Sequence, residues 1–275
     1  MGEILVETTE KKGAHPIDQV FAVKSEDLLN VYFTAGYPKL EDTATILKAL
    51  DRAGVDFVEI GMPFSDPIAD GSTIQESNDV ALKNGISISK LFEQLDAVKG
   101  EYNVPVILMG YMNPVLQYGI ENFCKRCQQA GVSGLIIPDL PMYDYLRHYK
   151  EMFEQYGLYN IFLISPQTSE ARIREIDENS NGFIYMVSSA SITGAKSDIS
   201  TQQEEYFQRI NGMNLRNPRL IGFGISNHET YSKACDYAQG AIIGSAFIKA
   251  LKAAGEGQLE PTIKQFVQSI KNSEQ

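Results

Sequence analysis

Short apolar runs alternate with longer amphipathic segments along almost the whole chain, and this alternation constrains the fold more than any other feature. Continuous apolar runs are typical of strands buried on both faces, as in a parallel sheet covered by helices. The expected strands are Val31–Ala35, Asp56–Gly61, Val104–Met109, Gly134–Pro138, Asn160–Ile164, Phe183–Ser188, Leu220–Gly224 and Ala241–Gly244. The expected helices are Leu40–Ala53, Ile88–Val98, Ile120–Ala130, Tyr143–Tyr156, Ser169–Asn179, Gln202–Met213, Asn227–Ala238 and Pro261–Lys271.

Eight strand–helix units in a chain of 275 residues predict an α/β fold, a single (β/α)8 TIM barrel. The alternative is a doubly wound open sheet, which usually has fewer strands, and no Gly-x-Gly-x-x-Gly motif follows the first expected strand. Residues 1–16 are polar and predict a flexible extension, and residues 17–275 form the expected barrel domain. An extra helix over Ile17–Leu29 is expected before the first strand.

Charge and composition limit the classes of partner. The chain has 35 acidic and 24 basic residues, a formal net charge of −11, and no run rich in Lys or Arg, which disfavours a nucleic-acid partner. No apolar stretch approaches the roughly 20 residues that span a bilayer, and no signal-peptide pattern opens the chain. We therefore expect a cytoplasmic protein. Cys124 and Cys127 form an isolated Cys-x-x-Cys on one face of an expected helix, which predicts packing and no metal site.

The second expected strand contains a carboxylate, Glu59, inside an apolar run. Burying a carboxylate is costly unless it is paired or protonated, and apolar neighbours raise its pKa into the range that suits proton transfer near neutral pH. The alternative is an ion pair with a Lys or Arg of a neighbouring strand, but no expected strand contains either residue. Asp66 and Asp70 follow in a proline-stiffened loop, where aspartates more often form turns or caps.

Two glycine-containing turns end the last two expected strands and open helices, over Ile221–Ser226 and Ile242–Phe247. Glycine lets the main chain approach a ligand, and helix N-termini attract anions. In TIM barrels phosphate binds after strands seven and eight, so these turns predict a phosphate site, with packing glycines as the alternative. The small, polar segment 188–200 suits a mobile lid, or simply a flexible surface loop.

The remaining chemistry follows from two features that the sequence lacks. No Lys ends an expected strand, which disfavours Schiff-base chemistry, and no cluster of His and acidic residues offers a metal for an enolate. The pattern therefore favours carboxylate acid–base chemistry on a phosphorylated substrate. The aromatic residues expected beside it are Tyr32, Tyr111, Tyr185 and Phe223.

The string VEIGMPFSDPIADG (Val58–Gly71), preceded by FTAGYP and followed by GFGIS and GSAF, resembles the tryptophan synthase alpha subunit family from about Val31 to Phe247. The resemblance implies a lyase of the retro-aldol type that cleaves indole-3-glycerol phosphate to indole and glyceraldehyde 3-phosphate in tryptophan biosynthesis. It implies no cofactor of the chain's own. It also implies a beta subunit that carries pyridoxal phosphate and receives the indole through a tunnel, in an alpha2beta2 tetramer.

Carried over by position, the resemblance makes Glu59 the catalytic acid–base and Asp70 the catalytic aspartate, which holds the indole N–H. It implies substrate and phosphate contacts by Tyr32, Tyr111, Tyr185, Thr193, Gly194, Phe223, Gly224, Gly244 and Ser245. It implies a beta-subunit interface at Asp66, Pro67, Asn113, Asp139 and Pro141. Many family members have Gly-Val-Thr-Gly where this chain has Ser-Ile-Thr-Gly at 191–194, so Thr193 and Gly194 are kept.

Two other functions remain open at this stage. Another phosphate-binding barrel, an isomerase or phosphosugar lyase, is disfavoured because isomerases of this kind usually pair a carboxylate with a His, and no His ends an expected strand. A non-catalytic barrel kept as a binding subunit is disfavoured because it has no need of a buried, unpaired Glu59.

Overall fold

The computed structural model describes residues 15–67, 70–187, 201–222 and 224–272. Its strands form one parallel sheet in the order β5-β4-β3-β2-β1-β9-β8-β7-β6. The strands are β1 (Leu28–Thr34), β2 (Phe57–Gly61), β3 (Val106–Met109), β4 (Val132–Ile136), β5 (Tyr159–Asn160), β6 (Leu163–Ile164), β7 (Ile184–Val187), β8 (Arg219–Gly222) and β9 (Gly240–Ile243).

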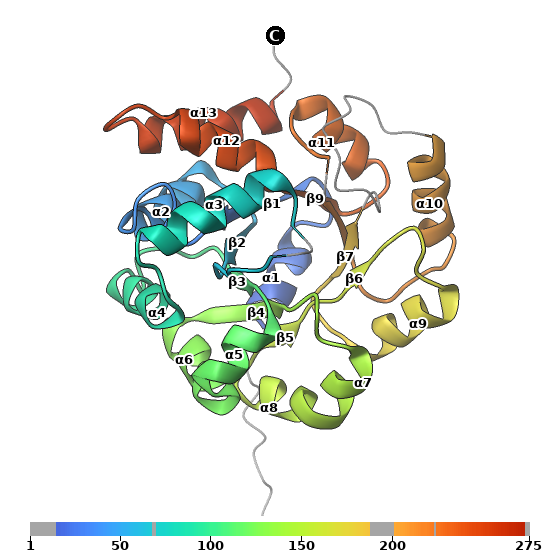
Figure 1. Ribbon diagram of the computed structural model, residues 1–275. Coiled ribbons are helices and arrows are strands. Elements are labelled where there is room, and N and C mark those ends of the chain that lie inside the picture. Colours follow the sequence, from blue (N-terminus) through green and yellow to red (C-terminus); the bar gives the residue numbers. More distant parts are fainter. Residues whose placement is uncertain (1–14, 68–69, 188–200, 223, 273–275) are drawn as a thin grey trace, which may run out of the picture.

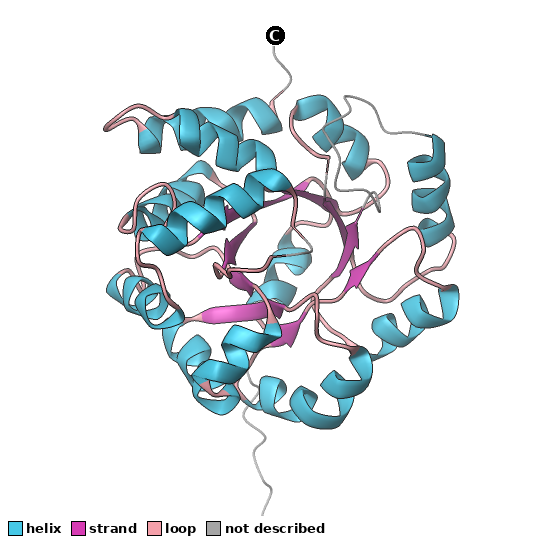
Figure 2. Cartoon of the chain, viewed as in Figure 1, coloured by secondary structure: helices cyan, strands magenta, loops and turns pink. Residues whose placement is uncertain are grey.

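The strands at the two ends of this order, β5 and β6, both lie within one strand expected from the sequence, Asn160–Ile164. β5 pairs with β4 and β6 pairs with β7, and only two residues separate β5 from β6. Within that gap, the Ile161 N–H donates to the Leu135 carbonyl at 2.8 Å, and the Phe162 carbonyl accepts from the Tyr185 N–H at 3.0 Å. β5 and β6 are therefore halves of one strand, and the sheet closes into the eight-stranded ring of Figure 2. The barrel prediction is confirmed, and the open sheet is excluded.

Helices surround this ring on the outside (Figure 1). They are α2 (Asp42–Ala53), α3 (Ser72–Lys83), α4 (Ile88–Ala97), α5 (Met112–Tyr118), α6 (Ile120–Ala130), α7 (Met142–Asp144), a π-helical turn η1 (Tyr145–Tyr149), α8 (Lys150–Gln155), α9 (Glu170–Asn179), α10 (Thr201–Asn211), α11 (His228–Cys235), α12 (Ser245–Ala253) and α13 (Leu259–Lys271). All eight expected helices are present, although their ends are shifted by a few residues. Two further helices, α3 and α5, follow the second and third strands and were not predicted from the sequence.

The N-terminal helix is shorter than expected. The prediction of a helix over Ile17–Leu29 is wrong at its end, because α1 (Pro16–Val23) stops early and Leu28 already pairs with Gly240 as the start of β1. Asp27 has a φ of 54°, which a continuing helix does not allow. Figure 1 shows α1 behind the strand ring. The start of the barrel domain at residue 17 stays a prediction, since residues 1–14 lie outside the described part.

Two apolar clusters stabilise the fold. One fills the barrel interior, where α1 contributes a residue to close the N-terminal end: Ile17, Leu28, Phe57, Ile107, Ile136, Ile161, Phe183, Tyr185, Leu220 and Ile242. The other packs the strands against the outer helices, and it contains both Cys124 and Cys127, as predicted.

Within the described ranges no group of His, Cys, Asp and Glu is arranged to hold a metal. No described helix is long and apolar enough to cross a membrane.

Candidate active site

Glu59 lies in the middle of β2 and is fully buried. It stands in register with Tyr32 of β1 and Ile107 of β3. Its Oε2 accepts a hydrogen bond of 2.9 Å from Nδ2 of Asn30, whereas Oε1 has no hydrogen-bond partner among the described residues. Burial raises the pKa of Glu59 to about 8; the Asn30 bond opposes this shift, and the charge of Asp70 adds to it. A carboxyl with this pKa is largely protonated at neutral pH.

The ion-pair alternative for Glu59 is not observed. β8 begins one residue earlier than expected, at Arg219, so one strand does carry a basic residue. Even so, Glu59 forms no ion pair with any residue in the described ranges, and its polar partner is Asn30. The sequence carries no signal for this pairing, because Asn30 lies just outside the first expected strand.

Asp70 lies in the loop between β2 and α3, close to the start of α3. The Tyr111 hydroxyl donates to Oδ2 of Asp70 at 3.3 Å. Burial raises the pKa of Asp70 to about 6, and the Tyr111 bond opposes this. The loop is folded on itself: the Asp70 N–H donates to the Pro67 carbonyl at 3.0 Å, and the Gln75 amide of α3 donates to the Asp70 carbonyl at 2.9 Å. These contacts hold the Asp70 backbone in place, and the Tyr111 bond holds its carboxylate.

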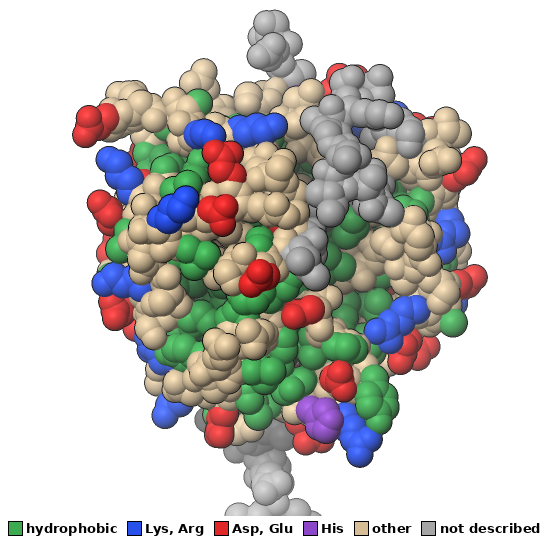
Figure 3. Space-filling model, viewed as in Figure 1, with side chains coloured by type: hydrophobic (Ala, Val, Ile, Leu, Met, Phe, Trp, Pro, Cys, Tyr) green, Lys and Arg blue, Asp and Glu red, His purple; other side chains and the backbone are tan. Residues whose placement is uncertain are grey.

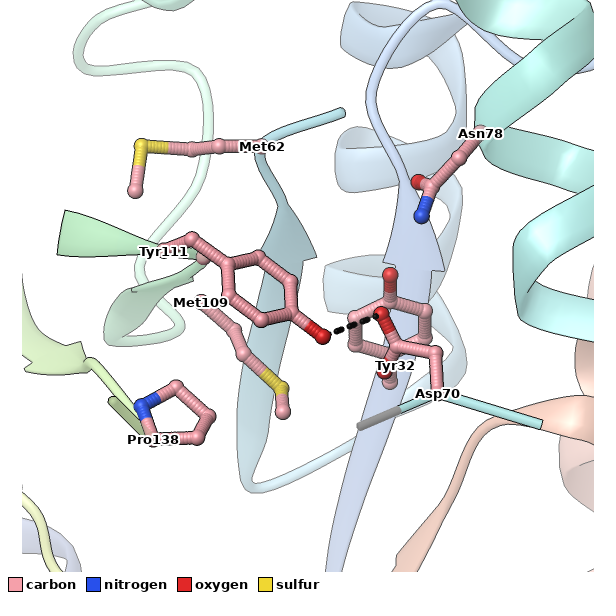
Figure 4. Close-up of a pocket in the computed structure, with 8 residues that line it drawn as sticks. Tyr32, Met62, Asp70, Asn78, Met109, Tyr111 and Pro138 are labelled. Carbon is pink, nitrogen blue, oxygen red and sulfur yellow. Dashed lines mark hydrogen bonds between the residues drawn. The ribbon is translucent and has the colours of Figure 1, made fainter. Parts of the chain in front are cut away.

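A cavity opens at the carboxyl ends of β1 to β4, and Figure 4 shows the Tyr111–Asp70 bond beside it. Its lining contains three of the predicted residues together with apolar groups: Tyr32, Met62, Asp70, Asn78, Met109, Gly110, Tyr111 and Pro138. Glu59 is not part of this lining. Glu59 is paired in register with Tyr32 on the neighbouring strand. A ligand that packs against the Tyr32 ring would therefore lie close to the Glu59 carboxyl.

Asn78 is a cavity residue that the sequence analysis missed. It lies on α3, is 3% exposed, and its Oδ1 has no hydrogen-bond partner in the described part of the chain. The signal that could have located it is the helical spacing of Ile74, Asn78 and Ala81, all of which are buried. The buried face of α3 contains few apolar residues, so the segment does not have the pattern of an amphipathic helix.

Two buried tyrosines lie across glycines of the neighbouring strands. A Cβ added to Gly61 would lie 2.6 Å from Cζ of Tyr32, and one added to Gly222 would lie 2.6 Å from Cζ of Tyr185. Only glycine leaves room for these rings. Burial raises the Tyr185 pKa strongly, and the nearby charges of Glu59 and Asp70 contribute. Tyr185 is thus placed in the barrel interior near both carboxyls.

The second glycine turn lies against Tyr32, one of the residues that line the cavity. Gly244 precedes Ser245, the first residue of α12, and a Cβ on Gly244 would lie 3.3 Å from Cδ1 of Tyr32. The first N–H groups of a helix have no partner within it and so present positive charge there. Gly224, in the first glycine turn, has a φ of 83°. Thr193, Gly194, Phe223 and the expected lid 188–200 lie outside the described residues.

The residues expected to face a partner follow β2, β3 and β4: Asp66, Pro67, Asp139 and Pro141 lie in loops, and Asn113 lies in the first turn of α5. Most are exposed, but two have local structural roles. Asp139 accepts the Met112 N–H at 2.9 Å at the start of α5, and Pro67 is buried. Hydrophobic side chains are exposed on this face in Figure 3. The large exposed apolar residues of α5, α7 and η1 are Leu116, Tyr143 and Leu146.

Comparison with known proteins gives consistent results. The family model described as tryptophan synthase alpha chain matches residues 20–275. The tryptophan synthase alpha chain of Christiangramia forsetii is 57% identical over 237 residues, which are 86% of this chain and 93% of that protein. That of Flavobacterium psychrophilum is 56% identical over 247 residues, 90% of this chain and 96% of the relative. The crystal structure of tryptophan synthase subunit alpha from Legionella pneumophila matches with a TM-score of 0.83 at 30% identity, covering 94% and 97% of the two chains.

Proposed function

The chain belongs to the tryptophan synthase alpha chain family, and we propose that Glu59 and Asp70 carry out that family's reaction in this protein. Members of the family are lyases of tryptophan biosynthesis that cleave indole-3-glycerol phosphate to indole and glyceraldehyde 3-phosphate. The observation that carries the assignment is the pair of carboxyls itself. Glu59 is buried with a pKa of about 8, and Asp70 lines the adjacent cavity with a pKa of about 6.

Glu59 acts first as the acid and then as the base. Protonated Glu59 gives its proton to C3 of the indole ring, and the ring nitrogen takes up the positive charge. The Glu59 carboxylate then removes the proton of the side-chain hydroxyl next to the ring. The electron pair of that O–H bond forms the aldehyde, and the pair of the breaking carbon–carbon bond returns to the ring. Glu59 ends the cycle protonated, and general acid–base catalysis of this kind contributes about 10²–10⁴-fold.

Asp70 stabilises the charge that develops on the ring. In its ionised form it accepts the indole N–H and opposes the positive charge on that nitrogen, an electrostatic effect that grows where water is excluded. The Tyr111 hydroxyl bond to Oδ2 directs the carboxylate. Met62, Met109 and Pro138 line the cavity with apolar surface that suits a flat ring.

The phosphate is assigned to the two glycine turns, with the positive N-terminal end of α12 as the main attraction. Gly224, Gly244 and Ser245 would contact it through backbone groups, and Tyr32 next to Gly244 connects this end of the substrate to the cavity. The family resemblance adds phosphate contacts from Gly194 and Phe223, and it places Tyr185 and Thr193 beside the substrate.

We assign no cofactor to this chain, because the proposed steps need only the two carboxyls. The partner is a beta subunit that carries pyridoxal phosphate and takes up the indole, in a cytoplasmic alpha2beta2 complex. The exposed Leu116, Tyr143 and Leu146 lie near Asn113 and Pro141 on the face that opens to the cavity, which supports docking there.

Incubation of the purified protein with indole-3-glycerol phosphate tests this function. Indole release should be measurable from the chain alone and should increase when a beta subunit is added. Absence of indole in both conditions would overturn the proposed function.

A further inference from the structure

Asn30 is a polar residue in the apolar interior of the barrel. Asn30 is completely buried, with a relative exposure of 0%, and it does not line the cavity. It stands in register with Phe57 of β2 and Ile242 of β9, both members of the interior apolar cluster. Its Nδ2 donates to Glu59, and its Oδ1 has no hydrogen-bond partner within the described residues.

Such a residue is unfavourable for stability alone. A buried amide with an unsatisfied oxygen destabilises the folded state relative to a satisfied one, and an apolar side chain of similar size would fill the same space. The benefit of Asn30 must therefore come from the one bond that it makes. That bond reaches Glu59, the carboxyl that the proposed reaction depends on.

The register shows from which side Asn30 reaches Glu59. Tyr32 is level with Glu59, and Asn30 precedes Tyr32 by two residues on the same strand. Asn30 is therefore one inward position closer to the amino end of the barrel, whereas the cavity lies at the carboxyl end. The amide holds the carboxyl from the side opposite the cavity.

We propose that Asn30 is a positioning residue for Glu59, which fixes Oε2 and leaves Oε1 as the oxygen that exchanges the proton with substrate. The assignment deepens the proposed function and rests on it. A bond to one carboxyl oxygen limits rotation of the carboxyl group, so the same free oxygen can give the proton to the ring and then accept the hydroxyl proton. Asn30 supplies the anchor.

Asn30 also counterbalances burial. An N–H donor stabilises the charged form of a carboxyl and so lowers its pKa. The other ionisable groups that face Glu59 are Asp70, Tyr32 and Tyr185, and none of them is basic. The negative charge of Asp70 raises the pKa of Glu59, and the tyrosines are neutral. Asn30 is thus the group in the described structure that keeps the Glu59 carboxylate accessible as a base.

The test measures the titration of Glu59 directly, by carboxyl ¹³C NMR with the resonance assigned by its loss in Glu59→Gln. Asn30→Leu has a similar volume and no donor, and we expect the titration midpoint to rise by about one pH unit or more. Asn30→Asp keeps the shape and should shift the midpoint in the same direction, because a second carboxyl disfavours the Glu59 charge. The alkaline limb of kcat/KM should move by the same amount.

Asn160→Leu is the matched control. Asn160 is another buried strand asparagine, in β5, and its side chain has no hydrogen-bond partner in the described ranges. Its replacement should leave the Glu59 titration and the pH profile unchanged. Folded Asn30→Leu and Asn30→Asp variants with the wild-type midpoint would overturn the proposal. A wild-type chain that releases no indole would instead overturn the proposed function, and the NMR titration would still decide whether Asn30 controls Glu59.

Discussion

Two carboxyls in one site have different pKa values because they differ in burial and in partners. Glu59 is fully buried and bonded to an amide, whereas Asp70 is partly exposed and accepts from the Tyr111 hydroxyl. At neutral pH the first is mostly protonated and the second mostly ionised, with pKa values of about 8 and about 6. One site thus holds an acid and an anion at the same pH.

This difference predicts a bell-shaped pH dependence. The value of kcat/KM should rise as Asp70 ionises, through its pKa of about 6, and fall as Glu59 loses its proton, through its pKa of about 8. Initial rates of indole release over this range measure both limbs. An activity that instead increased through the upper pKa would show that Glu59 must enter the reaction as the carboxylate.

Asp70 and Asp66 should respond differently to the same substitution. Asp70→Asn replaces the anion in the cavity by a neutral amide, so basal cleavage should fall by about 10²-fold or more. Asp66 is exposed and bonded only to its neighbour Ser65 among the described contacts, so Asp66→Asn should keep most basal cleavage and weaken activation by a beta subunit. Equal losses of basal indole release in the two variants would contradict this division.

For individual residues, the sequence predicts those properties that depend on neighbours in the chain. A glutamate within an apolar strand already indicates a raised pKa, and the structure agrees for Glu59. Asp70 could not be separated from Asp66 by pattern, because its distinguishing contact, with Tyr111, joins residues 41 apart. Asn30 was missed for the same reason, because its bond to Glu59 joins residues 29 apart. Asn78 was missed because α3 has little apolar contrast.

Among the elements, the strand pairs β1/β2 and β7/β8 place the aromatic rings of the site. The Tyr32 ring crosses Gly61, and the Tyr185 ring crosses Gly222. A side chain at Gly61 or Gly222 would overlap the ring, so each ring can lie in this position only because the adjacent strand has a glycine there.

Gly222→Ala should therefore displace Tyr185. The new Cβ would lie 2.6 Å from Cζ of the buried ring, and overpacking of this kind costs about 1–3 kcal/mol of unfolding free energy. We expect a higher KM as well, because the ring would move toward the site. Gly212→Ala, where the new Cβ would lie 3.6 Å from the nearest atom, the Arg209 carbonyl oxygen, is the control and should leave KM unchanged. Urea unfolding and steady-state kinetics give both quantities.

The elements that the sequence predicted well are those with strong apolar periodicity. All eight expected strands are present, although the fifth is divided into β5 and β6 where it turns from β4 to β7. α3 was missed because its buried face includes Ser77 and Asn78, which reduce the apolar contrast. The end of α1 was misplaced because Leu28 and Leu29 continue the apolar pattern into β1.

The whole molecule has two ends with different roles. α1 closes the amino end with Ile17, and the carboxyl end carries the cavity together with exposed apolar side chains. Partner docking at the carboxyl end would let the product pass directly from one subunit to the other.

This asymmetry predicts different effects of a charge introduced at the two ends. Leu116 on α5 is 48% exposed, and Leu116→Glu should weaken binding of a beta subunit by about tenfold or more, since a buried interface disfavours an unpaired charge. Val23, at the end of α1, is 90% exposed, and Val23→Glu should leave binding unchanged. Basal indole release should be preserved in both. Equal affinities of the two variants, measured by titration calorimetry, would place the interface elsewhere.

The most direct test of the account is indole release by Glu59→Gln. Glutamine has nearly the same shape but cannot exchange the proton, so turnover should fall at least about 10²-fold, while the thermal stability and the affinity for a glycerol phosphate ligand stay close to wild type. A folded Glu59→Gln protein that retains more than about a tenth of the wild-type rate would contradict the catalytic role of Glu59.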